Sequence, residues 1–279
     1  MKISIITAVY NNKEHIESCI NNVLSQTYQD IEYIIIDGGS TDGTVNTIKN
    51  YIPPAGMRKL KTCLPVGKVI NELENYIFIS EKDSGIYDAL NKGIKLATGE
   101  VIGLLHSDDL FYDEKVLEKI VDVFKEKEVD SVYSDLLYVY KDNPDKVLRY
   151  WKAGEFNYSL LNRGWMPPHP TIFIKKKVYD ELGGFDSSYK IASDYELMLR
   201  LLGKHKISSA YLPEVTIKMR AGGKSNKSLK NIFQKSSEDY KALKQNEFPF
   251  PAYTLFLKNV RKVPQFIRRG ECKKIIQKA

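Results

Sequence analysis

One stretch of this sequence predicts a helix between two strands: Ser80-Glu-Lys-Asp-Ser-Gly-Ile-Tyr-Asp-Ala-Leu-Asn-Lys-Gly-Ile-Lys-Leu-Ala-Thr-Gly-Glu100, followed by Val101-Ile-Gly-Leu-Leu-His-Ser-Asp-Asp109. The pattern indicates a strand end, a turn, an amphipathic helix over residues 86–96, a second turn and a buried strand. Asp108 and Asp109 then stand at the carboxyl end of that strand, where open α/β sheets bind ligands. By itself, such a pair is more often a helix cap or a solvated loop than a cation site.

The residues on the N-terminal side continue the same alternation. Ile3-Ser-Ile-Ile-Thr-Ala-Val9 is a β-rich run, and the helical pattern after it has an apolar face made of Ile16, Ile20, Val23 and Leu24. Tyr33-Ile-Ile-Ile36 and Tyr76-Ile-Phe-Ile79 are two further buried runs. Strands that alternate with helices in this way predict an α/β fold with a largely parallel sheet.

Composition limits the class of protein. The chain has 279 residues, 43% of them hydrophobic, which is enough to bury a full core. Cys19, Cys63 and Cys272 are odd in number and lack metal-type spacing, so reduced thiols in the cytoplasm are expected. No apolar run approaches the roughly 20 residues that a membrane-spanning helix needs. A soluble protein, or one peripheral to the inner face of the plasma membrane, is therefore expected.

The formal charge of +7 is unevenly distributed along the chain. Lys218 to Ala279 contains 16 Lys and Arg against 4 Asp and Glu, so this part carries +12 and the remainder about −5. A basic tail of this kind suits an anionic surface such as lipid headgroups or lipid diphosphates. Nucleic-acid binding is disfavoured because the basic excess is confined to the tail.

Five motifs together resemble the family 2 glycosyltransferases: Ser4-Ile-Ile-Thr-Ala-Val-Tyr-Asn-Asn12, Ile36-Asp-Gly-Gly-Ser-Thr-Asp-Gly-Thr44, Asp83-Ser-Gly-Ile-Tyr-Asp-Ala-Leu-Asn-Lys-Gly93, Ser107-Asp-Asp109 and Ser193-Asp-Tyr-Glu-Leu-Met-Leu-Arg-Leu201. The resemblance implies a GT-A fold with a mostly parallel, Rossmann-like nucleotide-binding sheet and flanking helices. It also implies a nucleotide-sugar donor, a Mg²⁺ or Mn²⁺ ion and inversion at the anomeric carbon. We expect a glycosyltransferase domain over residues 1–225 and a basic helical extension over residues 226–279.

The resemblance places the base of the nucleotide at the ends of the first two strands. Asp37 is expected to accept a hydrogen bond from uracil N3, with Thr7 and Ala8 on the other side of the base pocket. Tyr10 is expected near the base, although an aromatic residue there is as often part of the core. A turn followed by a helix cap explains the motif around Asp37 equally well, except for Asp37 itself.

The resemblance also implies that Asp83 and Asn91 lie near the nucleotide and the Ser-Asp-Asp loop. Lys92 and Lys95 fall outside the apolar stripe of the predicted helix, and a solvated face is the expected place for both.

The Ser-Asp-Asp loop receives two roles from the resemblance. Asp108 is expected to bind ribose or sugar hydroxyls, and Asp109 is expected to bind the metal ion. A nucleoside diphosphate gains negative charge as it leaves, and a cation on its phosphates stabilises that charge by several kcal/mol.

Asp194 is the residue that the resemblance makes the general base, which takes a proton from the acceptor hydroxyl. The family often has Glu where Ser193 stands, and this difference weakens the motif without removing the base. From the residues alone, Ser193 or Asp194 is an equally good helix cap.

Four further residues are candidate contacts with substrate or metal. His169, in the Pro-rich loop Trp165-Met-Pro-Pro-His-Pro-Thr171, is expected either in solvent or in the site as a metal or phosphate contact. Trp165 could form a platform for an acceptor sugar. Arg220 or Lys224, in a glycine-containing segment, could close over the diphosphate.

These expectations combine into a metal-dependent hexosyltransferase that moves a sugar from a UDP-sugar to a hydroxyl of a cell-surface glycan or lipid-linked saccharide. One alternative is a nucleotidyltransferase, but residues 7–14 lack the glycine that its phosphate loop needs. Another is an inactive binding module, which predicts loss of a base or metal carboxylate. The C-terminal tail is expected to bind an anionic membrane face, or else to pack on the main domain or on a second subunit of a homo-oligomer.

Overall fold

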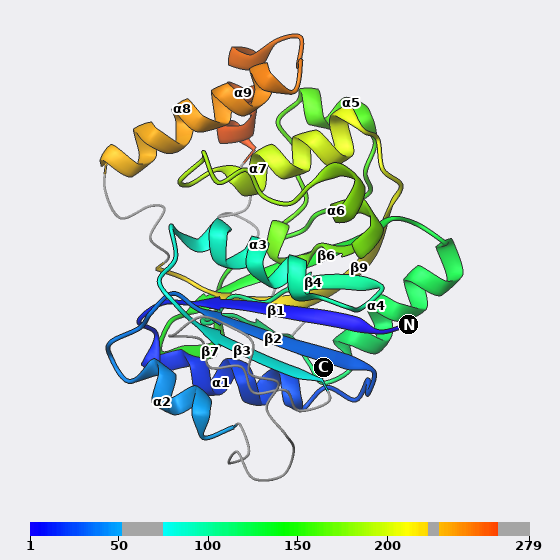
Figure 1. Ribbon diagram of the computed structural model, residues 1–279. Helices are drawn as coiled ribbons and strands as arrows, with labels where there is room; N and C mark the ends of the chain where they lie inside the picture. Colours follow the sequence, from blue (N-terminus) through cyan, green and yellow to red (C-terminus); the bar gives the residue numbers. More distant parts are fainter. Residues whose placement is uncertain (52–74, 223–228, 262–279) are drawn as a thin grey trace. The chain divides into compact units, whose positions relative to one another are not determined.

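A computed structural model describes residues 1–51, 75–222 and 229–261, which form two compact units (Figure 1). Unit 1 contains Met1–Val121 and Phe173–Phe185, and unit 2 contains Asp122–Ile172 and the chain from Asp186 onward. Cys63, Lys224 and Cys272 lie outside the described residues. Cys19 is a buried free thiol, as expected for a reduced cysteine.

Unit 1 is built on a sheet with the strand order β3-β2-β1-β4-β8. The strands β1 (Ile3–Val9), β2 (Ile31–Asp37), β3 (Tyr76–Ser80) and β4 (Val101–Leu104) are parallel, and the short β8 (Phe173–Lys175) runs antiparallel to β4. The register pairs Val9 with Asp37 and Asp37 with Ser80, so the carboxyl ends of three strands lie at one edge of the sheet. The predicted parallel sheet is confirmed.

Helices cover both faces of this sheet, which explains why every residue of β1 is buried. The helix α3 (Ile86–Leu96) lies on one face, and α1 (Lys13–Leu24) and α2 (Thr44–Lys49) lie on the other (Figure 1). The expected apolar face of α1 was wrong at Leu24, which is exposed in the last turn of the helix. Ile86, in the first turn of α3, is also exposed. The short strand β5 (Leu110–Phe111) follows the Ser-Asp-Asp loop.

Close packing in unit 1 is clearest where β8 meets β4. A Cβ atom on Gly103 would lie 2.3 Å from the Phe173 ring, so only glycine fits beneath that ring. Phe173 also stacks on Phe111, with ring centroids 6.5 Å apart.

Unit 2 contains a second set of strands, in which β6 (Ser131–Tyr140) pairs with β7 (Asn143–Trp151) and with β9 (Ser209–Arg220). The first pairing is antiparallel and the second is parallel. Unit 2 also contains α5 (Tyr158–Asn162), the 3₁₀ turn η1 (His169–Thr171) and α7 (Ser193–Met198), which continues as the π-helix η2 (Leu199–Lys204). The helix α6 (Lys176–Leu182) belongs to unit 1, and α4 (Val116–Lys127) has residues in both units.

The chain after residue 228 forms two helices of unit 2, α8 (Leu229–Gln245) and α9 (Pro251–Val260). The second of these helices packs tightly against residues 162–164 of unit 2. A Cβ atom on Gly164 would lie 2.4 Å from the backbone nitrogen of Lys258, and the Thr254 hydroxyl donates to the Asn162 carbonyl at 2.9 Å. The expected boundary between residues 225 and 226 therefore falls inside unit 2. Within the described ranges, no helix combines the length and the apolar character needed to span a bilayer.

Candidate active site

Asp37 occupies the carboxyl end of β2 and is fully buried. Its Oδ2 atom accepts hydrogen bonds from the backbone N–H groups of Gly39 and Ser40, at 3.1 and 3.0 Å, and from the Ser80 hydroxyl at 2.7 Å. Its Oδ1 atom accepts no hydrogen bond from the part of the chain that the structure describes. One oxygen thus fixes the carboxyl group, and the other is a buried acceptor without a donor among the described residues.

Tyr10 and Asp83 lie against the same turn. A Cβ atom on Gly38 would be 3.2 Å from Asp83 Oδ2 and 3.5 Å from Tyr10 Cδ2, so both side chains contact the residue that follows Asp37. Tyr10 is 53% exposed, which makes it a surface residue at the end of β1 and not part of the core. The structure therefore brings together three of the residues expected to hold the nucleotide.

Asp83 is paired with Lys92, a residue for which the sequence predicted a solvated face. Lys92 Nζ contacts Asp83 Oδ1 and lies 3.1 Å from Glu81 Oε1 and 3.4 Å from Asp88 Oδ2. Burial lowers the pKa of Lys92, but the hydrogen bonds and charges of Asp83 and Glu81 outweigh burial and raise that pKa above its usual value. The expected solvated face for Lys92 was wrong, because its cation neutralises a cluster of carboxylates.

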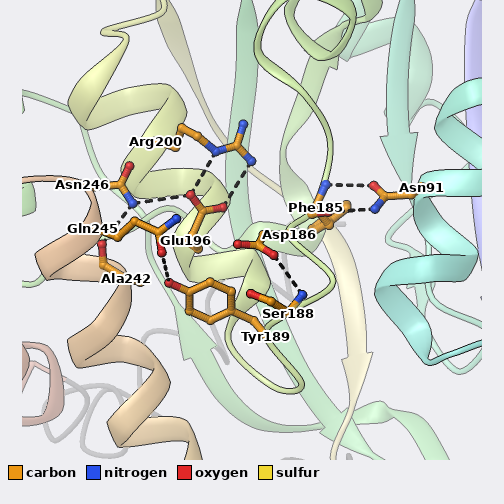
Figure 2. A network of polar contacts seen from close by, with 10 residues as sticks. All are labelled: Asn91, Phe185, Asp186, Ser188, Tyr189, Glu196, Arg200, Ala242, Gln245 and Asn246. Atoms are coloured by element: carbon orange, nitrogen blue, oxygen red, sulfur yellow. Dashed lines mark hydrogen bonds and ion pairs between the residues drawn. The ribbon is translucent and has the colours of Figure 1, made fainter.

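Two other expected nucleotide contacts have structural roles. The Thr7 hydroxyl is buried and donates to the Leu105 carbonyl at 2.8 Å, which leaves Thr7 facing the core of unit 1. The Asn91 side chain donates to the Phe185 carbonyl and accepts from the Phe185 N–H group, both at 2.8 Å (Figure 2). These bonds engage the polar atoms of both side chains, and the expected contacts of Thr7 and Asn91 with a nucleotide stay predictions. Ala8 is buried within β1.

The Ser107-Asp108-Asp109 loop follows β4 closely. The Asp109 N–H group donates to the His106 carbonyl at 2.9 Å, and the Asn12 amide donates to the Ser107 hydroxyl at 2.8 Å, which ties the loop to the end of β1. Asp109 is buried and Asp108 is half-buried. Burial, aided by the negative charges of Asp109 and Asp108, raises the pKa of Cys19 to about 12.

The donor set of this loop fits a hard cation. Among residues 1–51, 75–222 and 229–261, no group of three or more His, Cys, Asp or Glu side chains could hold a metal ion. Mg²⁺ is usually held by one or two carboxylates together with substrate phosphates, and Asp108 and Asp109 supply carboxylates of this kind.

Asp194 lies in the first turn of α7, in unit 2. Its Oδ2 atom is 3.0 Å from His169 Nδ1, so η1 and α7 bring together two residues that are 25 positions apart in the sequence. Burial raises the pKa of Asp194, but the charges of His169, Lys258 and Lys235 outweigh burial and lower it below the usual value. Asp194 is therefore ionised near neutral pH, as a proton acceptor must be.

The expected cap of α7 was wrong. The cap position is Ala192, whose side chain makes no capping hydrogen bond. The Glu238 carboxylate of α8 binds the backbone there instead. Sequence reasoning missed Glu238 and Lys258, because neither belongs to a motif and both act on residues far away along the chain.

The remaining candidates differ in their surroundings. Trp165 is 6% exposed, donates its indole N–H to the Ala153 carbonyl at 2.9 Å and stacks on Phe156, so it has no open ring face for an acceptor sugar. The expected acceptor platform at Trp165 stays a prediction. Arg220 is the last residue of β9 and is also buried, which does not fit a mobile closing loop.

Comparisons with known proteins agree with this arrangement. The sequence model described as Glycosyl transferase family 2 matches residues 4–191. A "PGL/p-HBAD biosynthesis glycosyltransferase" of Mycobacterium bovis is 27% identical over 225 residues, covering 80% of this chain and 78% of the relative. An uncharacterized glycosyltransferase of Rickettsia typhi is 29% identical over 280 residues, covering 96% of this chain and 75% of the relative.

Two solved structures have a similar fold. Staphylococcus aureus TarS residues 1–349 in complex with UDP-GlcNAc aligns with a TM-score of 0.62 at 14% identity, covering 88% of this chain and 65% of that one. The mannosyltransferase PcManGT from Pyrobaculum calidifontis, in complex with GDP-Man and Mn²⁺, aligns with a TM-score of 0.60 at 17% identity, covering 92% and 68%. The protein thus belongs to glycosyltransferase family 2 and has the GT-A fold.

Proposed function

We propose that this protein transfers a sugar from a UDP-sugar, with inversion, to a hydroxyl group of a cell-surface glycan or a lipid-linked saccharide. The observation that carries the choice of nucleotide is the buried Asp37, whose Oδ1 atom is available as an acceptor. Uracil N3 and guanine N1 bear hydrogens that such an acceptor can bind, whereas cytosine N3 and adenine N1 do not. UDP-GlcNAc in the TarS structure supports uridine, and GDP-Man in PcManGT makes guanosine the competing outcome.

Asp194 is the proposed general base. Its lowered pKa keeps it ionised, and its pairing with His169 at 3.0 Å fixes its orientation. The phosphate leaving group needs no proton, so one carboxylate is enough, unlike in the two-carboxylate glycoside hydrolases.

Asp109 is the proposed ligand of a Mg²⁺ or Mn²⁺ ion, with Asp108 on the ribose or sugar hydroxyls. When bound, the ion would act as a Lewis acid on the departing diphosphate. Mn²⁺ in the PcManGT complex supports this proposal.

The test is to incubate the purified protein and Mn²⁺ with a panel of UDP-, GDP- and CMP-sugars and to follow release of the nucleotide. We expect release from a UDP-sugar that increases with a saccharide acceptor and is abolished by Asp194→Asn. Release from GDP-sugars only would overturn the assignment to uridine. Transfer of a nucleotidyl group, or tight UDP binding without turnover of any donor, would support the alternatives considered above.

We further propose that the C-terminal end rests on an anionic lipid surface, near a lipid-linked acceptor. Tyr253, Phe256 and Val260 lie on one exposed face of α9, and residues 261–279 carry seven Lys and Arg against one Glu. Binding should appear in flotation with anionic liposomes at low salt and should weaken at high salt or after removal of residues 262–279. Unchanged flotation of the shortened chain would instead support packing on a second subunit.

A further inference from the structure

We propose that Glu238, on α8, is a positioning residue for Asp194. The inference rests on the proposed function, since Asp194 needs a fixed orientation only if it acts as the base. It makes the two C-terminal helices part of the catalytic machinery, although they lie beyond the residues that match the family.

The contact itself is a clasp between one carboxylate and three successive backbone groups. Glu238 Oε2 accepts from the N–H groups of Ile191 and Ala192, at 2.8 and 2.9 Å, and Oε1 accepts from Lys190 N–H at 3.2 Å. Burial raises the pKa of Glu238, but these bonds and one from Gln234 outweigh burial and lower it. The carboxylate is therefore ionised and accepts bonds assisted by its charge.

The position of the clasp connects it to the base. The first turn of a helix has N–H groups without partners inside the helix, and these attract a carboxylate. Ala192 is the cap of α7 and offers no side-chain acceptor, and the N–H group of this cap residue is one of the three that Glu238 binds. Only Ser193 separates the clasped residues from Asp194, so the clasp fixes the start of the turn that carries the base.

The same two helices also hold α7 on the far side of Asp194. Lys258 Nζ of α9 lies 3.2 Å from the centre of the Tyr195 ring and 2.7 Å from Asp239 Oδ2. Asn246 donates to Glu196 at 3.5 Å and the Tyr189 hydroxyl donates to Gln245 at 2.9 Å (Figure 2). Contacts with the C-terminal helices thus precede and follow the base in the sequence.

The hydrogen bonds of Glu238 go to backbone N–H groups and Gln234, which makes its effect on Asp194 indirect. A displacement of about 1 Å in a catalytic group costs about 10²-fold in rate. Loss of a general base costs about 10² to 10⁴-fold. Loosening the turn without removing the base should therefore lower kcat by about 10- to 100-fold.

The experiment compares Glu238→Ala, Glu238→Gln and Glu247→Gln in the full chain. Glu247 is a matched control, because it forms an exposed ion pair with Lys204 at 3.1 Å. The readouts are kcat and KM for transfer, corrected for the folded fraction by circular dichroism, the Kd of UDP, and amide hydrogen exchange over residues 189–194. Glu238→Gln keeps an acceptor oxygen and serves as the conservative variant if Glu238→Ala folds poorly.

We expect Glu238→Ala to lower kcat 10- to 100-fold with little change in the UDP Kd, and to speed exchange at residues 190–192. Glu238→Gln should recover part of the loss, and Glu247→Gln should match the wild type. Wild-type kcat in both Glu238 variants, or unchanged exchange, would overturn the positioning role alone. No turnover by the wild-type protein would overturn the proposed function, and the positioning role with it.

Discussion

The buried pair of Lys258 and Asp239 gives the sharpest test of how the C-terminal helices are held. Their side chains are 6% and 4% exposed, and Lys258 Nζ lies 2.7 Å from Asp239 Oδ2. Asp239 Oδ1 accepts no hydrogen bond from the described residues, so Lys258→Met would leave a buried carboxylate without its ion-pair partner. Removing one member of a buried pair typically costs about 3–5 kcal/mol, and this is the destabilisation that we expect.

The double variant Lys258→Met, Asp239→Leu separates the charge effect from packing. Replacing both members of a buried pair by apolar side chains is often neutral or stabilising, so the double variant should recover most of the loss. Lys204→Met is the control, since its exposed pair with Glu247 should contribute at most about 1 kcal/mol.

Urea denaturation followed by tryptophan fluorescence measures these differences. Trp151 and Trp165, the two tryptophans of the chain, both lie in unit 2, so their signal reports the unit that contains the pair. The reasoning would be refuted if Lys258→Met cost less than about 1 kcal/mol, or if the double variant were as unstable as the single one.

Three further predictions concern the proposed site. Asp37→Asn should weaken UDP binding by about 10- to 100-fold in calorimetry, because a hydrogen bond to a charged acceptor contributes about 1.5–3 kcal/mol; unchanged affinity would remove Asp37 from the base pocket. UDP binding should require a divalent cation and should weaken far more in Asp109→Ala than in Asp194→Ala, and full affinity in EDTA would contradict this. Because the pKa of Glu238 is lowered by folding, its carboxylate stabilises the fold fully at pH values above its usual pKa of 4.5. This contribution disappears as pH falls through the folded-state pKa. The stability difference between wild type and Glu238→Gln should accordingly be largest at pH 7 and shrink below about pH 4 in urea denaturation.

The elements that sequence patterns predicted best are those with the strongest periodicity. The buried runs that became β1, β2 and β3, and the helix over residues 86–96, are confirmed with boundaries within two residues. Each of them buries a face whose pattern is visible within a dozen residues, so local sequence contains the signal.

The contacts that sequence patterns did not predict share a physical cause, which is that side-chain partners lie far apart in the sequence. Thr7 is fixed by Leu105 and Asn91 by Phe185, both about 95 positions away. The helical pattern around Lys92 does not predict that Lys92 contacts Glu81 and Asp83 of the preceding turn. Polar side chains of this kind could be placed on an element from sequence, but their roles needed the tertiary partner.

The clasp on α7 sets a rule for exchanging segments between relatives. The match to the family ends at residue 191, and sequence patterns suggest a boundary at residue 225, so either position looks like a natural place for a chimera. A hybrid joined at residue 225 would separate Asp194 from Glu238 and Lys258, and it would combine one protein's base with another protein's anchor. A hybrid joined at residue 191 would separate Lys190 and Ile191 from the Glu238 carboxylate that binds their N–H groups. Acceptor preferences should therefore be transplanted only with junctions that keep residues 190–258 from a single parent.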